Sequence, residues 1–302
     1  MTRRSAIRTL MLASAGSCGS KLIGDDEPNY VIHSEVRLVL LDVSVTDVHG
    51  STISGLAQQS FHVLENGQPQ TITVFENHDV PVTVGILVDE SFSMIPKRGQ
   101  VLTAAGIFIK QSNPRDQMFV LNFNDVVQRG LPENELFSDD VLKLRTALYR
   151  GKPEGRTALN DALVAGLEQL EMGRRDKKTL VVISDGGDNA STHSRRQTLD
   201  RVETSLATVY TIGLFDEDDP DRDPGLLRRL AAISGGQAYF PPNVSGMIPV
   251  CERIAKDIRS RYTVGYAPRP ENGKSSLRHV DVRVTAPSGA RLDARTRTRY
   301  RY

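Results

Sequence analysis

The sequence predicts an α/β protein with a doubly wound, mostly parallel sheet and a small β-sandwich module built from its two flanks. Residues 82–88 form a continuous apolar run, which is typical of a central strand covered by helices on both faces. Strand-like and helix-like segments alternate over residues 81–260, as they do in doubly wound sheets. Residues 30–80 and 261–302 show period-two alternation instead, which indicates antiparallel strands.

Length, charge and cysteine content limit the function classes. The 302 residues exceed the length of one typical domain, so we expect a large domain and a smaller one. The 38 basic and 37 acidic side chains nearly cancel, which argues against nucleic acid or an anionic membrane as the main partner. The chain has only two cysteines, so a disulfide framework is not expected. Cys251 lies in an apolar helical stretch and is expected in the core.

Residues 1–22 resemble an export signal, because a basic start is followed by a short apolar stretch and small residues. Arg8 interrupts the apolar stretch, which keeps a cytosolic chain as the alternative. Cys18 follows small residues, as in a bacterial lipoprotein cleavage box, although Ala15 stands where Leu is usual, so Cys18 is a candidate for lipidation. No other run approaches the roughly 18 to 20 apolar residues that span a bilayer. We therefore expect an extracytoplasmic protein, in the periplasm or cell envelope or secreted.

The first flank, residues 30–80, is expected to form strands joined by hairpins. Residues 36–47 alternate apolar and polar side chains, and so do residues 61–65 and 70–75. Asn66-Gly67 separates the last two runs and supplies the positive φ angles of a type I′ turn. No candidate chemistry accompanies these strands.

The central unit, residues 81–260, alternates elements in the order that a doubly wound sheet requires. Ser138-Asp139-Asp140 places a capping residue and early acids at the start of one expected helix. Helices are expected over residues 98–111, 138–149, 157–172, 194–206, 225–234 and 245–259. Strands are expected over residues 82–89, 118–123, 126–131 (a short edge strand, antiparallel to its neighbour), 179–184, 208–214 and 238–240.

The second flank, residues 261–302, alternates again over residues 262–266 and 280–284. We expect it to pair with the first flank in one sandwich. The last residues carry arginines at every second position, which would place them on one face of a strand. A solvent-facing edge protected against aggregation explains this pattern, and the alternating residues are Arg295, Arg297, Arg299 and Arg301.

Polar residues follow the buried strands and begin one of the helices. Asp89 ends the first apolar run and is followed by Ser91 and Ser93. Thr157 stands at the start of an apolar-periodic helix, where it also suits a helix N-cap. Asp185 follows the second buried strand. Because ligands gather at the carboxyl ends of parallel strands, these oxygen donors are expected to meet there and to hold a hard divalent cation.

These residues resemble the metal-ion-dependent adhesion site of the von Willebrand factor type A fold, which is Asp-x-Ser-x-Ser, then a distant Thr, then a distant Asp after a strand. All five positions are filled, and Phe92 stands where Gly is common. Asp161, one helical turn after Thr157, is expected to orient the ligands without touching the metal. Residues 36–302 as a whole, with flanking β segments behind an export signal, are similar to the bacterial von Willebrand factor type A-related extracytoplasmic family. The activity of that family is largely undefined.

The resemblance implies a non-enzymatic, divalent-cation-dependent protein-binding module with an adhesive or scaffolding role. Mg²⁺ is the expected ion, with Mn²⁺ and Ca²⁺ as alternatives. Neutral oxygens leave the ion positively charged with an open position, so a partner protein that presents Glu or Asp is expected to fill it. The resemblance assigns neutral oxygens to Ser91, Ser93 and Thr157, and contacts made directly or through water to Asp89 and Asp185.

Two other functions remain open. A magnesium-dependent phosphoryl or ester hydrolase would need a general base, for which Glu90 and Asp188 are the nearby acids. A purely structural envelope protein with a vestigial site is the other alternative. Six acids among residues 216–223 could hold a second cation or form a solvated loop, and Pro224 excludes an EF-hand because it stands where that loop requires Gly. The sequence has no nucleophile elbow, dinucleotide turn or Walker loop.

Overall fold

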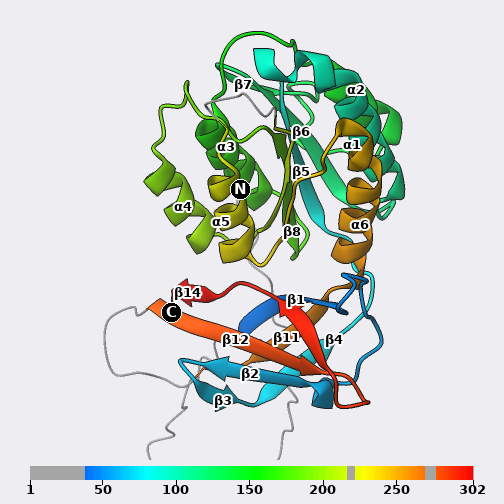
Figure 1. Cartoon of the computed structure of the whole chain (residues 1–302), viewed down its shortest axis with the longest axis vertical. Helices are drawn as coiled ribbons and strands as arrows, with labels where there is room; N and C mark the ends of the chain where they lie inside the picture. Colours follow the sequence, from blue (N-terminus) through cyan, green and yellow to red (C-terminus); the bar gives the residue numbers. More distant parts are fainter. Residues whose placement is uncertain (1–37, 216–221, 269–276, 302) are drawn as a thin grey trace, which may run out of the picture. The chain divides into compact units, whose positions relative to one another are not determined.

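The computed structural model describes residues 38–215, 222–268 and 277–301. Residues 37–302 form one compact unit that contains two separate hydrophobic cores. One core belongs to an α/β unit and runs from Val82 to Ile258, and the other belongs to a β module assembled from both flanks. Figure 1 shows the two sheets with the helices gathered around one of them.

The α/β unit is built on a six-stranded sheet. All neighbouring strands in it are parallel except the edge strand β7, which is antiparallel to β6. Every residue of β5 is buried, as expected of a central strand with both faces covered. The strand order is β10 (Ala238–Tyr239), β9 (Thr208–Gly213), β8 (Lys178–Ser184), β5 (Thr83–Asp89), β6 (Gln117–Phe123) and β7 (Val127–Arg129).

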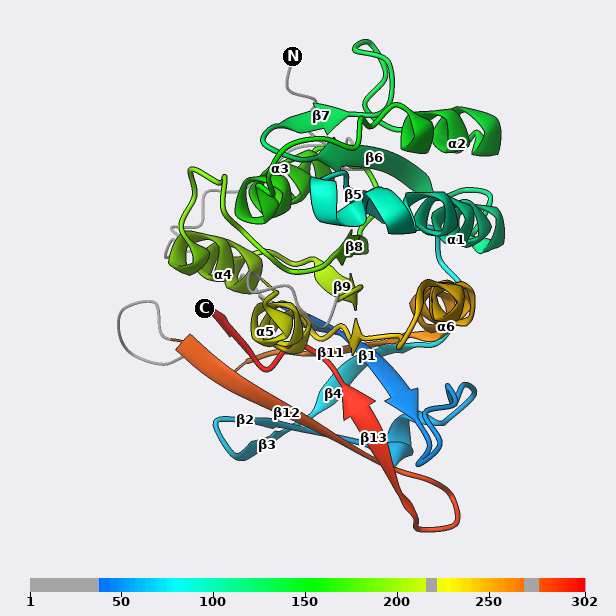
Figure 2. The same ribbon diagram turned by 45° about the horizontal axis from the view of Figure 1, so that its top comes forward.

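Helices cover both faces of this sheet, so the predicted doubly wound α/β fold is confirmed (Figure 2). One face carries α1 (Arg98–Gln111), α2 (Val141–Tyr149) and α6 (Met247–Ser260). The opposite face carries α3 (Leu159–Glu171), α4 (Arg195–Thr204) and α5 (Pro224–Ser234). Short 3₁₀ segments occur at η1 (Gln58–Ser60), η2 (Phe92–Lys97) and η3 (Val244–Gly246).

Local sequence explains where several of these helices begin. Asp140 accepts hydrogen bonds from the backbone N–H groups of Leu142 and Lys143 in the first turn of α2, and Ser194 forms a capping box with Gln197 at the start of α4. Asp223 caps α5, whose first residue is Pro224. Cys251 is buried in the core on α6, as predicted.

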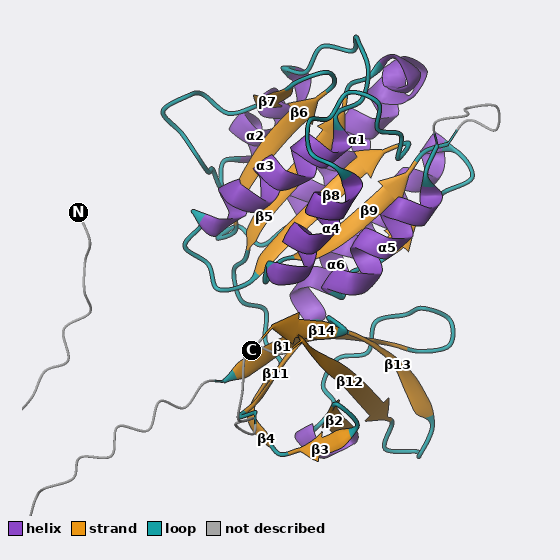
Figure 3. Cartoon of the chain, turned by 90° about the vertical axis from the view of Figure 1, so that its left-hand side faces the viewer, coloured by secondary structure: helices purple, strands orange, loops and turns teal. Residues whose placement is uncertain are grey.

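Strands of the two flanks are interleaved in the β module (Figure 3). β1 pairs with β11 on one side and with β13 on the other, so the predicted association of the flanks is observed. The strands follow one continuous hydrogen-bonded path, whereas the prediction was a sandwich of two sheets. The order is β3 (Gln68–Gln70), β2 (Phe61–Glu65), β12 (Leu277–Thr285), β13 (Arg291–Arg295), β1 (Val39–Thr46), β11 (Tyr262–Tyr266) and β4 (Ile72–Glu76), with β14 (Arg299–Arg301) paired to β12.

The module has its own core and its own buried ion pair. Alternate residues of β12 are buried, as the period-two pattern requires. Asn66 and Gly67 have φ angles of 48° and 78°, in agreement with the predicted turn between β2 and β3. Inside the module, Arg278 Nη1 lies 2.5 Å from Glu65 Oε1, and Tyr266 donates a 2.7 Å hydrogen bond to the same carboxylate.

The arginines at the end of the chain do not lie on one solvent-facing strand face, so that prediction is wrong. β13 ends at Arg295 and β14 begins at Arg299, which breaks the alternation between them. Arg297 is 9% exposed and donates to Ser205 O, and Arg299 forms an ion pair with Glu203 of α4. The α/β unit covers these side chains, and a strand pattern carries no information about such a neighbour.

Several predictions fall on residues outside the described ranges. These are the export signal over residues 1–22, the lipidation of Cys18 and the acidic stretch 216–221. The boundaries at residues 80/81 and 260/261 remain predictions. Within the described ranges, no helix has the length and hydropathy needed to cross a membrane.

Candidate metal site

The predicted oxygen ligands meet where β5 and β8 end. Asp89, the last residue of β5, accepts a 2.9 Å hydrogen bond from Ser91 N and a 2.6 Å hydrogen bond from Ser184 Oγ. Ser91 Oγ lies 3.1 Å from Ser93 Oγ, and Ser93 Oγ donates in turn to Asp185 Oδ2. A chain of hydrogen bonds therefore links the first motif to the acid that follows β8.

Thr157 reaches the same place from the loop before α3. Its backbone N–H donates to Asn189 Oδ1 at 3.0 Å, and its carbonyl accepts from Asn189 N and Ala190 N. The N-cap of α3 is Ala158, and α3 has no side-chain cap. The capping alternative for Thr157 is therefore wrong, and its hydroxyl is not used by the helix.

Ser91, Ser93, Thr157 and Asp185 line one cavity of about 190 Å³. Asp89 is not among its lining residues, since it lies one hydrogen bond behind the cavity, against Ser91 and Ser184. The structure thus brings four of the five predicted residues to one cavity and places the fifth in support. The remaining lining residues are Phe92, Gly155, Arg156, Gly187 and Asn189.

The two acids of this site stand close enough to influence each other. The pKa of Asp89 is raised to about 7, chiefly by burial and secondly by the negative charge of Asp185, while hydrogen bonds from Ser184 and Ser91 act in the opposite direction. Both carboxyls are nearly inaccessible, at 1% and 2% exposure. A cation beside them would favour the ionised form of Asp89, so the electrostatics of the residues present fit a bound divalent ion.

The chemistry of the donors fits a hard cation. Hydroxyl and carboxylate oxygens are the ligands that Mg²⁺, Mn²⁺ and Ca²⁺ prefer. Within the described part of the chain, no three His, Cys, Asp or Glu side chains are grouped in a way that could hold a metal. A cation in that part would therefore depend on the serine and threonine hydroxyls as much as on the acids.

Acids around the site hold its loops. Asp161 accepts from the backbone N–H groups of Thr192 and His193, and its Oδ1 lies 2.7 Å from His193 Nδ1. Asp188 accepts from Asn160 N at 2.7 Å and from Ser191 Oγ at 2.6 Å. These contacts fix the segment after β8 against the start of α3.

Glu90 points away from the cavity despite its place in the motif. The Glu90 side chain is 1% exposed, and its Oε2 lies 2.6 Å from Arg98 Nε in an ion pair. Gly151 packs so closely that a Cβ there would lie 2.3 Å from Glu90 Oε1. Glu90 therefore belongs to the packing between α1 and the loop after α2.

Three contributors to this site were not predicted from the sequence. Ser184 directly precedes Asp185 and donates to Asp89. Asn189 lies shortly after Asp185 and accepts from the backbone N–H of Thr157. Gly155 has a φ of +77°, in the left-handed region that favours glycine, and a Cβ there would lie 1.8 Å from Asp125 Oδ2, so this carboxylate would have to move. Proximity to Asp185 was an available signal for the first two residues, whereas the close approach to Asp125 exists only in the folded chain.

Comparisons with known proteins agree with this geometry. A family model described as von Willebrand factor type A domain matches residues 84–187. An uncharacterized protein of Synechocystis sp., sll0103, is 25% identical over 175 residues, which cover 56% of this chain and 40% of that protein. This chain thus spans less than half the length of that curated relative.

Two solved structures share the fold. One is a von Willebrand factor type A structure from Catenulispora acidiphila, with 14% identity, a TM-score of 0.54 and coverage of 80% of this chain and 72% of that chain. The other is proximal thread matrix protein 1 from the mussel byssus, with 14% identity, a TM-score of 0.52 and coverage of 65% and 51%. At these identities the likeness concerns the fold.

Proposed function

We propose, on the premise that this chain carries a von Willebrand factor type A domain, that it binds a divalent cation and, through it, an acidic side chain of a partner protein. The observation that carries the proposal is the cavity where Ser91, Ser93, Thr157 and Asp185 meet. The role is adhesion or scaffolding. Mg²⁺ is the expected ion, with Mn²⁺ and Ca²⁺ as alternatives.

The residues divide into ligands and supports. Ser91, Ser93 and Thr157 would offer neutral oxygens, while Asp185 and Asp89 would act directly or through water. When bound, the ion supplies a positive charge and an open coordination position that a partner carboxylate can take. The hydrogen bonds from Ser184 Oγ and Ser91 N hold Asp89 in place behind the hydroxyls. Asp161 keeps the neighbouring loop in register.

The rim of the cavity offers further contacts to a partner. Phe92 is 63% exposed and lines the cavity, so an apolar side chain next to the partner's acid would find a surface there. The side chain of Arg156 is 66% exposed, and its Nε lies 3.0 Å from Asp125 Oδ1. A second acid on the partner would meet this guanidinium.

A binding role fits the surrounding acids better than hydrolysis does. A metal-dependent hydrolase needs a free base or nucleophile beside the ion. Glu90 is paired with Arg98, and the same Asp188 oxygen accepts from both Asn160 N and Ser191 Oγ. Both candidate bases are therefore engaged in contacts that hold the structure.

The location outside the cytoplasm is part of this proposal and rests on the sequence of residues 1–22.

Calorimetric titration of the metal-free protein with MgCl₂ tests the cation. We expect saturable binding by the wild type and at least a tenfold loss in Thr157→Ala, because Thr157 lines the cavity and its hydroxyl caps no helix. Thr146→Ala is the matched control, since its hydroxyl is exposed and bonds only to Leu142 O on α2. Equal Mg²⁺ binding by all three proteins would refute the assignment.

Selection of peptides from a random library on the Mg²⁺-loaded protein tests the partner chemistry. We expect captured peptides to be rich in Glu and Asp, and to be released by EDTA. Replacing the acid by its amide should weaken capture at least tenfold. Steady turnover of p-nitrophenyl phosphate that disappears in Asp89→Ala would favour the hydrolase instead.

A further inference from the structure

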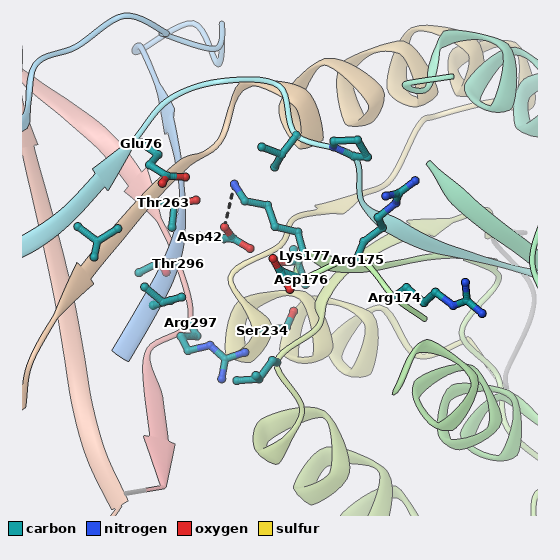
Figure 4. Close-up of a pocket in the computed structure, with 16 residues that line it drawn as sticks. Asp42, Glu76, Arg174, Arg175, Asp176, Lys177, Ser234, Thr263, Thr296 and Arg297 are labelled. Carbon is teal, nitrogen blue, oxygen red and sulfur yellow. Dashed lines mark ion pairs between the residues drawn. The ribbon is translucent and has the colours of Figure 1, made fainter. Parts of the chain in front are cut away.

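A second cavity, of about 510 Å³, lies at the opposite end of the α/β sheet, where the β module packs against it (Figure 4). Its walls come from β1, β4 and β11 on one side and from the segments that precede β8 and β9 on the other. The segment after β13 closes it with Thr296 and Arg297. This volume is in the range of small-molecule sites, which hold about 300 to 1,000 Å³.

Arg297 is a buried cation in the lining of this cavity. It is 9% exposed, and its Nη2 donates a 2.9 Å hydrogen bond to Ser205 O. In the described part of the chain it forms no ion pair. Burial lowers its pKa, while Asp42 acts in the opposite direction. Buried charges in proteins are normally paired, so this guanidinium is short of an anion.

The acids that line this cavity do not supply that anion. Asp42 is paired with Lys177, whose Nζ lies 3.1 Å from Asp42 Oδ1 (Figure 4). Glu76 and Asp176 are exposed and solvated. Of these three carboxylates, none lies within ion-pair distance of Arg297.

Part of the lining suits a ligand with an apolar body. Leu206 and Leu40 are 74% and 54% exposed, and Val74 and Val80 line the same cavity. Beside Arg297, Thr296 Oγ1 is buried and has no hydrogen-bond partner in the described part of the chain. A cavity that combines apolar side chains, a buried guanidinium without an ion pair among the described residues and an unused hydroxyl is complementary to a carboxylate that carries an apolar chain.

We propose that this cavity binds a small amphipathic carboxylate, with its anionic group on Arg297 and Thr296 and its apolar chain against Leu40, Val74 and Leu206. Arg297 is suited to this because a guanidinium can hold a carboxylate through two parallel hydrogen bonds. The site is independent of the metal cavity, since the two share no lining residue.

Calorimetric titration with sodium hexanoate and with 1-hexanol tests this site. The two probes have the same chain length, but only hexanoate carries a charge. We expect hexanoate to bind with one-to-one stoichiometry at least tenfold more tightly than the alcohol. Arg297→Gln should remove that preference, because the amide has no charge and cannot form the paired hydrogen bonds. Equal affinities for hexanoate and hexanol in the wild type would overturn the proposal.

A second variant keeps the test valid if Arg297→Gln fails to fold. Leu206→Glu adds a carboxylate to the cavity lining at an exposed position, so the fold should survive and hexanoate binding should fall at least tenfold. Leu142→Glu is the matched control, because Leu142 is 73% exposed on α2 and lines no part of this cavity. A urea denaturation curve with the same cooperative transition as the wild type would confirm that each variant is folded. Hexanoate affinity equal to that of the wild type in Leu206→Glu would also overturn the proposal.

Discussion

The two ends of the α/β sheet treat buried acids in opposite ways. At the carboxyl ends of β5 and β8, Asp89 and Asp185 lie near each other among hydroxyl groups. At the other end, Asp257 of α6 is 1% exposed and accepts a 2.5 Å hydrogen bond from Tyr210. Arg261 and Arg295 both place a guanidinium nitrogen 3.7 Å from Asp257. The counter-charge of the buried acid at this end comes from arginines of the chain, whereas on our proposal a bound cation would supply it at the metal edge.

The buried group of Asp257, Arg261 and Arg295, which we call the structural joint, differs in this way from the proposed binding site at the metal edge. Arg261 is 4% exposed and donates to Gly235 O at 2.6 Å and to Thr208 Oγ1 at 3.2 Å, so it ties the α/β unit to the start of β11. Burial acts to lower its pKa, but Tyr210 and Asp257 outweigh this effect and raise it. A joint of this kind needs no outside ligand. The metal edge, by contrast, should gain stability when a cation is added.

The largest expected effect comes from removing the built-in counter-charge. Asp257→Ala leaves Arg261 buried without that carboxylate, so we expect a loss of about 3 to 5 kcal/mol in the free energy of unfolding. Urea denaturation measures it. Asp281→Ala is the control, because Asp281 pairs with Arg283 at the surface and should cost about 1 kcal/mol or less. Similar losses of unfolding free energy in both variants would mean that the buried ion pairs of Asp257 stabilise the protein no more than a surface ion pair does.

The metal edge should show the opposite behaviour when no cation is present. The pKa of Asp89 in the folded protein, about 7, exceeds that of an unfolded aspartate, so the folded state binds more protons between pH 4 and pH 7. Stability should therefore fall as the pH rises through this window, by about 4 kcal/mol. Asp89→Asn should lack this decline and be more stable than the wild type at pH 8 in EDTA.

Denaturation curves from pH 4 to pH 8 for the two proteins provide the measurement. Asp116, whose pKa burial raises to about 6, contributes to both curves, so their difference isolates Asp89. If the two proteins lost stability equally as the pH rises, ionisation of Asp89 would not destabilise the folded protein.

Added Mg²⁺ should stabilise the wild type by about 2.7 kcal/mol at a concentration one hundred times its Kd. Ser93→Ala should lose most of this gain, because it removes a hydroxyl from the cavity. Asp257→Ala, although less stable, should keep the full gain, since the joint lies at the other end of the sheet. Urea denaturation with and without Mg²⁺ checks both statements. A lost response in Asp257→Ala would mean that the two ends are coupled.

The smallest expected effect concerns the rim of the metal site. Arg156→Ala should change the free energy of unfolding by less than about 1 kcal/mol, because the ion pair with Asp125 is exposed. Capture of peptides with two acids should nevertheless fall several-fold, since the guanidinium stands beside the cavity. Denaturation and peptide capture are measured on the same preparation. Unchanged capture would restrict recognition to the metal.

The sequence by itself determined the doubly wound sheet and the residues that gather at its edge. Continuous apolar runs end at Asp89 and just before Asp185, and parallel strands that end together bring their next residues to one edge. The strands of the flanks could also be predicted from the sequence, because alternation in β12 and the Asn66-Gly67 turn are local features. Local patterns of this kind depend only on backbone geometry.

Only the tertiary structure decided which of these residues face the cavity and which support it. Asp89 lies behind Ser91 because Ser184 comes from the neighbouring strand, and Glu90 is drawn away by Arg98. Arg297 fits an exposed strand pattern in the sequence, yet the α/β unit buries it. The physical reason is common to all three: a side chain's charge state and hydrogen bonds depend on which distant element packs against it, and the spacing of residues along the chain does not contain that information.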